Sequence, residues 1–168
     1  MIEIEKTQNP NVMNFYTNKP LLKEGFSLYA DSQTKTQNDF LQNVFTIAPL
    51  KRVLLLPDML FVEKKDEADF DKFAPLIMAF LEDLHITEAK NEALCLEKIE
   101  ALIEARIRPF LIRDGGNIEI IDFNDGVLSV RFEGHCKGCP HADQTLKNVI
   151  EHTIKKYLPQ VVCVQKEV

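Results

Sequence analysis

Two cysteines that stand two residues apart, Cys136 and Cys139, are the residues of this chain best suited to chemistry. Both fall within residues 134–141, where Gly134 and Gly138 allow backbone conformations that a side chain would resist. Pro140 suits the first position of a helix, because the N–H that proline lacks has no partner there. Cys139 is then expected at the N-cap, where the helix dipole favours the thiolate. This stretch therefore predicts a pair of thiolates able to bind a soft metal.

Two thiolates supply only half of a typical site. Tetrahedral zinc and iron–sulfur clusters usually take four protein ligands, so the other two must come from elsewhere in the chain or from a second copy. Cys95 falls on the apolar stripe of a predicted helix and is interpreted as a small core residue. Cys163 lies in a predicted strand, with no second ligand at a metal-site spacing. His135 and His141 flank the pair and are interpreted as solvated or helix-capping side chains.

Composition excludes several classes of function. The 168 residues are 45% hydrophobic and 27% charged, which is typical of a soluble globular protein with one domain or two small ones. The net charge is −6 and neither half of the chain is basic, so we expect no nucleic-acid partner. No apolar run approaches the ~20 residues of a membrane span. The first residues lack a secretion or transit pattern, so we expect a cytoplasmic protein, in which four cysteines do not form structural disulfides.

The elements that must position the thiols are predicted from the second half of the chain. An amphipathic pattern predicts a first helix, two alternating runs joined by Asn124-Asp125-Gly126 predict a hairpin, and a second helix and a last strand follow. In order, these elements span residues 95–107, 118–123, 127–132, 140–157 and 161–165. The order α-β-β-α-β predicts a three-stranded mixed sheet with helices on one face. Gly115 and Gly116 predict a turn, and the sequence leaves open whether it lies near the thiols.

The first half predicts a separate unit of strands and two helices, so the fold class is α+β with two small domains. Its strands are expected at residues 2–6, 12–16, 25–30, 52–56 and 59–64, and its helices at 36–45 and from the acidic run 66–71 to residue 84. Residues 86–93 contain several Glu and Ala but few apolar residues, and are interpreted as a linker. The domains are therefore expected at residues 1–85 and 94–168.

Several short motifs in their order along the chain resemble the NifU C-terminal-like family. They are Asp114-Gly115-Gly116, then the hairpin, then Cys136-Lys137-Gly138-Cys139-Pro140, then Leu146-Lys147-Asn148 and Ile150-Glu151. The resemblance covers roughly residues 94–166. Residues 7–82 are similar to the N-terminal domain of the longer, Nfu-type members, through Thr7-Gln8-Asn9-Pro10-Asn11, Pro57-Asp58 and the segment from Asp69 to Pro75.

The resemblance implies an iron–sulfur cluster carrier or scaffold rather than an enzyme. It implies that Cys136 and Cys139 of two protomers together hold a labile cluster, 4Fe–4S rather than 2Fe–2S, in a homodimer bridged by that cluster. The expected partners are an upstream assembly scaffold and apo iron–sulfur recipient proteins, with residues 1–85 acting in docking. His135 and His141 depart from the family pattern, where small or hydroxylic residues are expected.

Two other functions use the same residues. A Cys-x-x-Cys at a helix N-terminus can cycle between dithiol and disulfide, as in an oxidoreductase. A dithiol oxidoreductase is expected to carry this motif in a βαβ pattern, whereas here the motif follows a predicted hairpin. A zinc-binding module would use Cys136, Cys139 and His141 with one outside ligand, and no second ligand pair stands at the right spacing.

Overall fold

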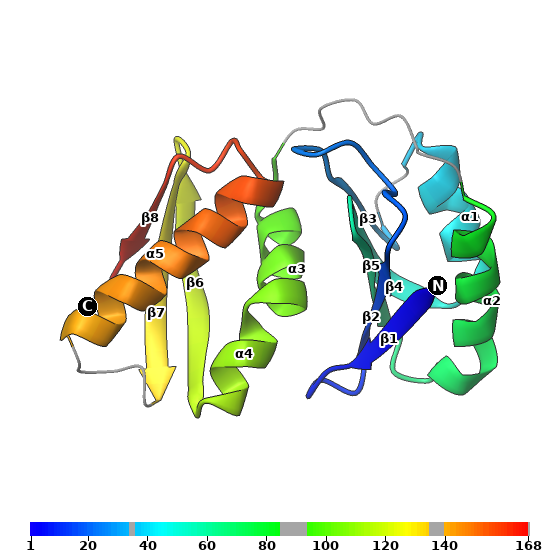
Figure 1. The fold of residues 1–168 in the computed structure, drawn as a ribbon, viewed down its shortest axis with the longest axis horizontal. Helices are drawn as coiled ribbons and strands as arrows, with labels where there is room; N and C mark the ends of the chain where they lie inside the picture. Colours follow the sequence, from blue (N-terminus) through cyan, green and yellow to red (C-terminus); the bar gives the residue numbers. More distant parts are fainter. Residues whose placement is uncertain (34–35, 85–93, 135–139, 168) are drawn as a thin grey trace. The chain divides into compact units, whose positions relative to one another are not determined.

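A computed structural model describes residues 1–33, 36–84, 94–134 and 140–167, with only the backbone given for residues 140–146. The chain divides into two compact units, Met1–Glu92 and Ala93–Val168 (Figure 1). The linker expected at residues 86–93 lies outside the described residues. No helix of the described part is long and apolar enough to cross a membrane.

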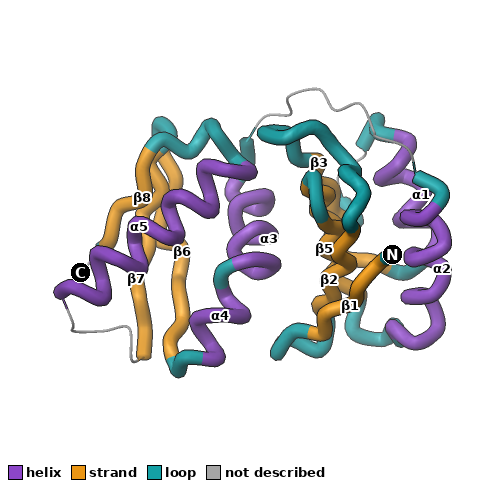
Figure 2. The backbone as a smooth tube through the Cα atoms, in the orientation of Figure 1, coloured by secondary structure: helices purple, strands orange, loops and turns teal. Residues whose placement is uncertain are grey.

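The N-terminal unit is one antiparallel sheet with two helices packed on one of its faces (Figure 2). The strand order is β1-β2-β5-β4-β3, and Leu56 pairs with Met59 around the turn at Pro57-Asp58, as the sequence predicted. The core between sheet and helices includes Phe15 of β2, Leu41 of α1 and Ile77 of α2, all buried. The strands are β1 (Ile2–Lys6), β2 (Val12–Thr17), β3 (Leu28–Asp31), β4 (Leu50–Leu56) and β5 (Met59–Lys64), and the helices are α1 (Asp39–Ile47) and α2 (Phe70–Glu82).

Both helices of this unit begin at side-chain caps. The Asn38 side chain accepts a hydrogen bond from the Leu41 N–H at 3.1 Å, and Asp69 accepts one from the Asp71 N–H at 3.1 Å. The sequence predicted that this helix would begin at residue 36, whereas α1 begins at Asp39. Thr36 lies just before the cap, and its hydroxyl accepts from the Asn38 N–H. Each cap satisfies an N–H that the first helical turn leaves without a partner.

The C-terminal unit contains the predicted three-stranded mixed sheet. Strands β6 (Gly116–Asn124) and β7 (Val127–Gly134) are antiparallel, and β8 (Cys163–Lys166) is parallel to β7. Asp125 and Gly126 have φ values of 47° and 81°, the left-handed geometry that a two-residue hairpin turn requires. Along β7, Leu128, Val130 and Phe132 are buried and alternate with residues that reach solvent, so one face of the sheet carries the core.

The helices of this unit are α3 (Leu96–Arg106), α4 (Arg108–Arg113) and α5 (Pro140–Tyr157). Contacts join α4 to β6, α5 to β8 and α3 to α5, which gives the predicted arrangement of helices over one face of the sheet. The sequence predicted a single helix over residues 95–107, whereas the structure has α3 and directly after it α4. Pro109 lies in the first turn of α4, where a missing N–H is tolerated.

The end of β7 lies against the turn that follows α4. Gly134 pairs with Gly116 in the hairpin register and has a φ of 69°. A Cβ atom placed on Gly134 would lie 2.3 Å from the carbonyl oxygen of Gly115 and 3.2 Å from the Cα of Gly116. Because these neighbours are backbone atoms, they cannot move aside as the tip of a side chain could. Only glycine fits at position 134.

The Glu151 side chain links α5 to β8. One carboxylate oxygen accepts from Lys155 Nζ at 2.6 Å, and the other accepts from the backbone N–H of Val164 at 2.9 Å. The hydrogen bond from Lys155 and then that from Val164 lower the pKa of Glu151 below its usual range. The charged form therefore stabilises the folded unit.

Replacing Gly134 by Ala is expected to destabilise the C-terminal unit by about 2 kcal/mol or more, because backbone strain and the clash with Gly115 add together. Gly25→Ala is the matched control, since Gly25 has a φ of 79° but nothing within 4 Å of its Cβ position. It should lose only about 1 kcal/mol of stability in its own unit. Hydrogen exchange of the strand amides in each unit measures both effects. Equal losses at the two positions would show that the contact with Gly115 contributes nothing.

Replacing Glu151 by Gln should lower the stability of the C-terminal unit by about 1 kcal/mol at pH 7, because the charged partner of Lys155 is lost. Since the pKa of Glu151 is lower in the folded state, its contribution is complete above the unfolded value and is lost as the pH falls through the folded value. Urea unfolding of both proteins between pH 7 and pH 3 should show their stabilities converging in acid. A constant difference across this range contradicts the role of the charge.

Candidate functional site

The predicted ligands Cys136 and Cys139 lie in residues 135–139, outside the described residues. The two ends of this thiol segment are described, and they are the last residue of β7, Gly134, and the first residue of α5, Pro140. Helix α5 spans Pro140–Tyr157, which confirms the predicted helix and the place of proline at its start. The N-cap role expected for Cys139 lies outside the described part, as does His135, and the side chain of His141 is not described.

The first end of the thiol segment is next to the two-glycine turn. Gly115 follows α4, has a φ of 77°, and donates its N–H to the carbonyl oxygen of Ile112 at 3.0 Å. The next residue, Gly116, begins β6 opposite Gly134. The sequence left open whether this turn lies near the thiols, and the hairpin register places it against the residue that leads into the segment.

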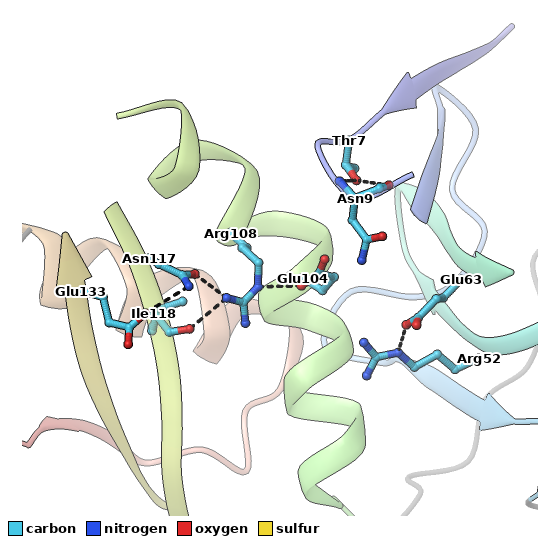
Figure 3. Close-up of polar contacts among 9 residues, drawn as sticks. All are labelled: Thr7, Asn9, Arg52, Glu63, Glu104, Arg108, Asn117, Ile118 and Glu133. Atoms are coloured by element: carbon cyan, nitrogen blue, oxygen red, sulfur yellow. Dashed lines mark hydrogen bonds and ion pairs between the residues drawn. The ribbon is translucent and has the colours of Figure 1, made fainter. Parts of the chain in front are cut away.

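A chain of polar contacts reaches the same end of the hairpin from the helices (Figure 3). Arg108, the first residue of α4, donates from Nε to Glu104 of α3 at 2.6 Å. Its Nη1 donates to the Asn117 side-chain oxygen and, at 3.0 Å, to the carbonyl oxygen of Ile118. Asn117 in turn donates from Nδ2 to Glu133 at 3.3 Å. The contacts therefore connect α3, α4 and β6 to the residue that precedes Gly134.

Sequence reasoning did not identify Arg108, Asn117 or Glu133. Nothing in the spacing of these residues relates them, because Asn117 and Glu133 meet only through the pairing of β6 with β7. The position of Arg108 beside Pro109 and the position of Asn117 beside the two glycines are the signals that could have suggested them.

The other two cysteines do not form a metal site with the described residues. Cys95 is the residue before α3 and is half-buried, so the expectation that it lies within the apolar stripe of a helix is wrong. Burial raises the pKa of its thiol, which makes it a poor thiolate. Cys163 begins β8 and is partly exposed. Within the described residues, no three His, Cys, Asp or Glu side chains gather closely enough to hold a metal ion.

The N-terminal unit has a cleft of about 490 Å³ beside the end of β3 and helix α1. Its lining mixes apolar side chains with polar and charged ones, among them Asp31, Gln42 and Lys65, and it includes no Cys or His. This lining lacks the side chains that bind soft metals.

Two family models match the chain. The model described as "Scaffold protein Nfu/NifU N terminal" matches residues 2–88, just over half of the chain, and the model described as "NifU-like domain" matches residues 99–165. The second match contains Cys136 and Cys139.

Curated relatives match along almost the whole chain. NifU-like protein 5, mitochondrial, of Arabidopsis thaliana is 30% identical over 185 residues, which cover 99% of this chain and 67% of the relative. NifU-like protein 4, mitochondrial, of the same plant is 28% identical and is covered to 65%. The human protein named "NFU1 iron-sulfur cluster scaffold homolog, mitochondrial" is 28% identical, with 98% of this chain and 71% of the relative covered. The chain thus spans about two thirds of the length of these relatives.

Solved structures resemble parts of the fold. A NifU-like protein from Saccharomyces cerevisiae has a TM-score of 0.44 and 16% identity, covering 48% of this chain and 74% of that one. A Staphylococcus aureus protein has a TM-score of 0.40 and 20% identity, covering 48% and 96%. The family models and the curated relatives confirm the resemblance seen in the sequence. The chain belongs to the Nfu/NifU family, with an Nfu N-terminal domain followed by a NifU-like domain.

Proposed function

We propose that the protein carries a labile iron–sulfur cluster on Cys136 and Cys139 and transfers it to apo-proteins during cluster assembly. The observation that carries this proposal is the match of residues 99–165 to the NifU-like domain, because that match includes both cysteines. A human relative that aligns with 98% of the chain bears the name of an iron–sulfur cluster scaffold. The cluster is the cargo of this protein, and a second protein is its destination.

The number of thiols explains why the cargo would be shared and released. One chain brings two thiolates, while a cluster usually takes four protein ligands, so two chains complete one coordination sphere. The positive end of α5, which begins at Pro140, favours the thiolate form of a cysteine directly before it. Cysteines of a recipient then replace the carrier thiolates by ligand exchange. No general acid or base is needed, which agrees with a carrier rather than an enzyme.

Finer features follow the same proposal. We take the cargo to be 4Fe–4S rather than 2Fe–2S, and the assembly to be a homodimer that the cluster bridges. The N-terminal unit would dock the upstream scaffold or the recipients. We place the protein in the cytoplasm, a reducing compartment in which cysteines such as Cys95 and Cys163 stay as free thiols.

A dithiol oxidoreductase is the second candidate, and one structural observation favours it. Strand β7, helix α5 and the parallel strand β8 form a βαβ unit, and the Cys-x-x-Cys lies between its first strand and its helix. The sequence had placed the motif after a hairpin, which counted against a redox role. In the structure the motif follows a hairpin and also lies within a βαβ unit, so its position in the fold suits both functions. Family membership favours the carrier.

Substituting the thiols tests the carrier directly. Cys136→Ala and Cys139→Ala should each abolish uptake of iron and sulfide during anaerobic reconstitution, because two variant chains together bring only two of the four thiolates that a cluster usually takes. Cys95→Ala and Cys163→Ala are matched controls and should keep the wild-type iron content. Iron and sulfide assays, the visible absorbance band and sedimentation of the holo-protein provide the measurements.

The wild-type protein should sediment as a dimer when loaded. An iron-free monomer after reconstitution, or full loading of Cys136→Ala, contradicts the proposal. An insulin-reduction assay on iron-free protein separates the oxidoreductase, which predicts turnover that both Cys136→Ala and Cys139→Ala abolish. Metal analysis of protein purified without oxygen tests the zinc module, which predicts one zinc ion for each monomer.

A further inference from the structure

We propose that Arg108 and Asn117 are positioning residues that fix the end of β7 and thereby determine how long the thiol segment retains its cargo. This inference rests on the proposed function, since it concerns retention by Cys136 and Cys139. Neither residue touches the cargo in this proposal. They act through Glu133, which precedes Gly134, the last residue before the thiol segment.

The guanidinium of Arg108 joins three elements at one point. Its Nε is bound to Glu104 of α3, and its Nη1 is bound to the side chain of Asn117 and to the carbonyl oxygen of Ile118. The side chain is about three-quarters buried, with 27% exposed. Because a guanidinium is planar and its donors are fixed in direction, these contacts define the position of β6 relative to α3 and α4.

The amide of Asn117 can lie in only one orientation between its two partners. Arginine donates and never accepts, so the amide oxygen faces Arg108. The amide nitrogen is then left to donate to Glu133 at 3.3 Å. An amide suits this place because it accepts from a cation on one side and donates to a carboxylate on the other. A second carboxylate at position 117 could still accept from Arg108, but it would repel Glu133.

Helix α4 therefore acts on the end of β7 from both of its own ends. At its beginning, Arg108 reaches Glu133 through Asn117. Just beyond its end, the carbonyl oxygen of Gly115 lies against the backbone of Gly134. Since Glu133 and Gly134 are adjacent, a short helix of six residues holds two consecutive residues in place immediately before the thiols. Loss of residues that orient metal ligands, without binding the metal themselves, typically lowers metal affinity by about 10–100-fold.

The substitution Asn117→Asp tests the contact between Asn117 and Glu133 with almost no change in side-chain size. It keeps the acceptor for Arg108 and removes the donor to Glu133. The double variant Asn117→Asp/Glu133→Gln returns a donor to the opposite side and has the net charge of the wild type. Arg108→Lys is a second test, because it keeps the positive charge beside Glu104 but removes the planar guanidinium, whose N–H donors have fixed directions. Glu119→Gln is the control, since it breaks the exposed ion pair of Glu119 with Arg131 at 3.0 Å on the same hairpin.

Cluster-loaded protein is challenged anaerobically with an iron chelator, and the half-time of iron release is measured. We expect release about tenfold faster for Asn117→Asp and for Arg108→Lys. The double variant should return to within about twofold of the wild type, and Glu119→Gln should not differ from it. The thermal midpoint of each protein is measured in parallel. The proposal is overturned if Asn117→Asp releases iron as slowly as the wild type, or if the double variant releases iron as fast as Asn117→Asp.

A second measurement separates this inference from the proposed function. The reaction of Cys136 and Cys139 with a disulfide reagent is followed in the metal-free protein, with Cys95 and Cys163 replaced by Ala. We expect several-fold slower reaction in Asn117→Asp, because the thiols spend less time near the positive end of α5, and recovery in the double variant. If the wild type takes up no cluster but this pattern appears, the carrier proposal fails and the positioning role stands. Equal rates in the wild type, Asn117→Asp and the double variant overturn the positioning role.

Discussion

The contact between two stretches of glycine backbone is the constraint on which the C-terminal unit depends. Gly134 approaches the carbonyl of Gly115 so closely that a single methyl group would not fit. This contact requires a turn directly after α4, a hairpin whose register places Gly116 opposite Gly134, and positive φ values at Gly115 and Gly134. Gly115 just before β6, Gly116 at its start and Gly134 at the end of β7 are therefore parts of one feature, although they are far apart in the sequence.

Much of this architecture could be predicted from the sequence because local chemistry determines it. The pair Asp125-Gly126 requires positive φ values, so the hairpin and its turn were predictable. Pro140 similarly indicated where α5 begins. Helix α4 was not predicted, because proline both ends a helix and suits the first turn of a new one, and the sequence alone does not separate these two roles for Pro109.

The polar contacts around Arg108 could not be predicted for a different reason. They depend on register, and the register of β6 with β7 shifts between Ile120 and Asp122. An irregularity of one residue changes which side chains lie opposite each other and on which face they lie. Asn117 and Glu133 therefore become neighbours only once the position of that shift is known. The order of the five strands in the N-terminal unit is likewise set by non-local pairing, which local turn signals do not specify.

A carrier must hold its cargo long enough to deliver it and weakly enough to release it. In the proposed arrangement the cluster is bound weakly because each chain brings only two thiolates and the other two belong to a separate molecule. The fold must then limit how much each pair of thiolates can move, or the shared site would not assemble at all. The glycine contact and the contacts of Arg108 both act on the residues before the thiol segment, while α5 begins directly after it. Fixed positions for the ends of β7 and α5 would suit transfer by exchange, since the recipient then replaces thiolates without unfolding the protein that presents them.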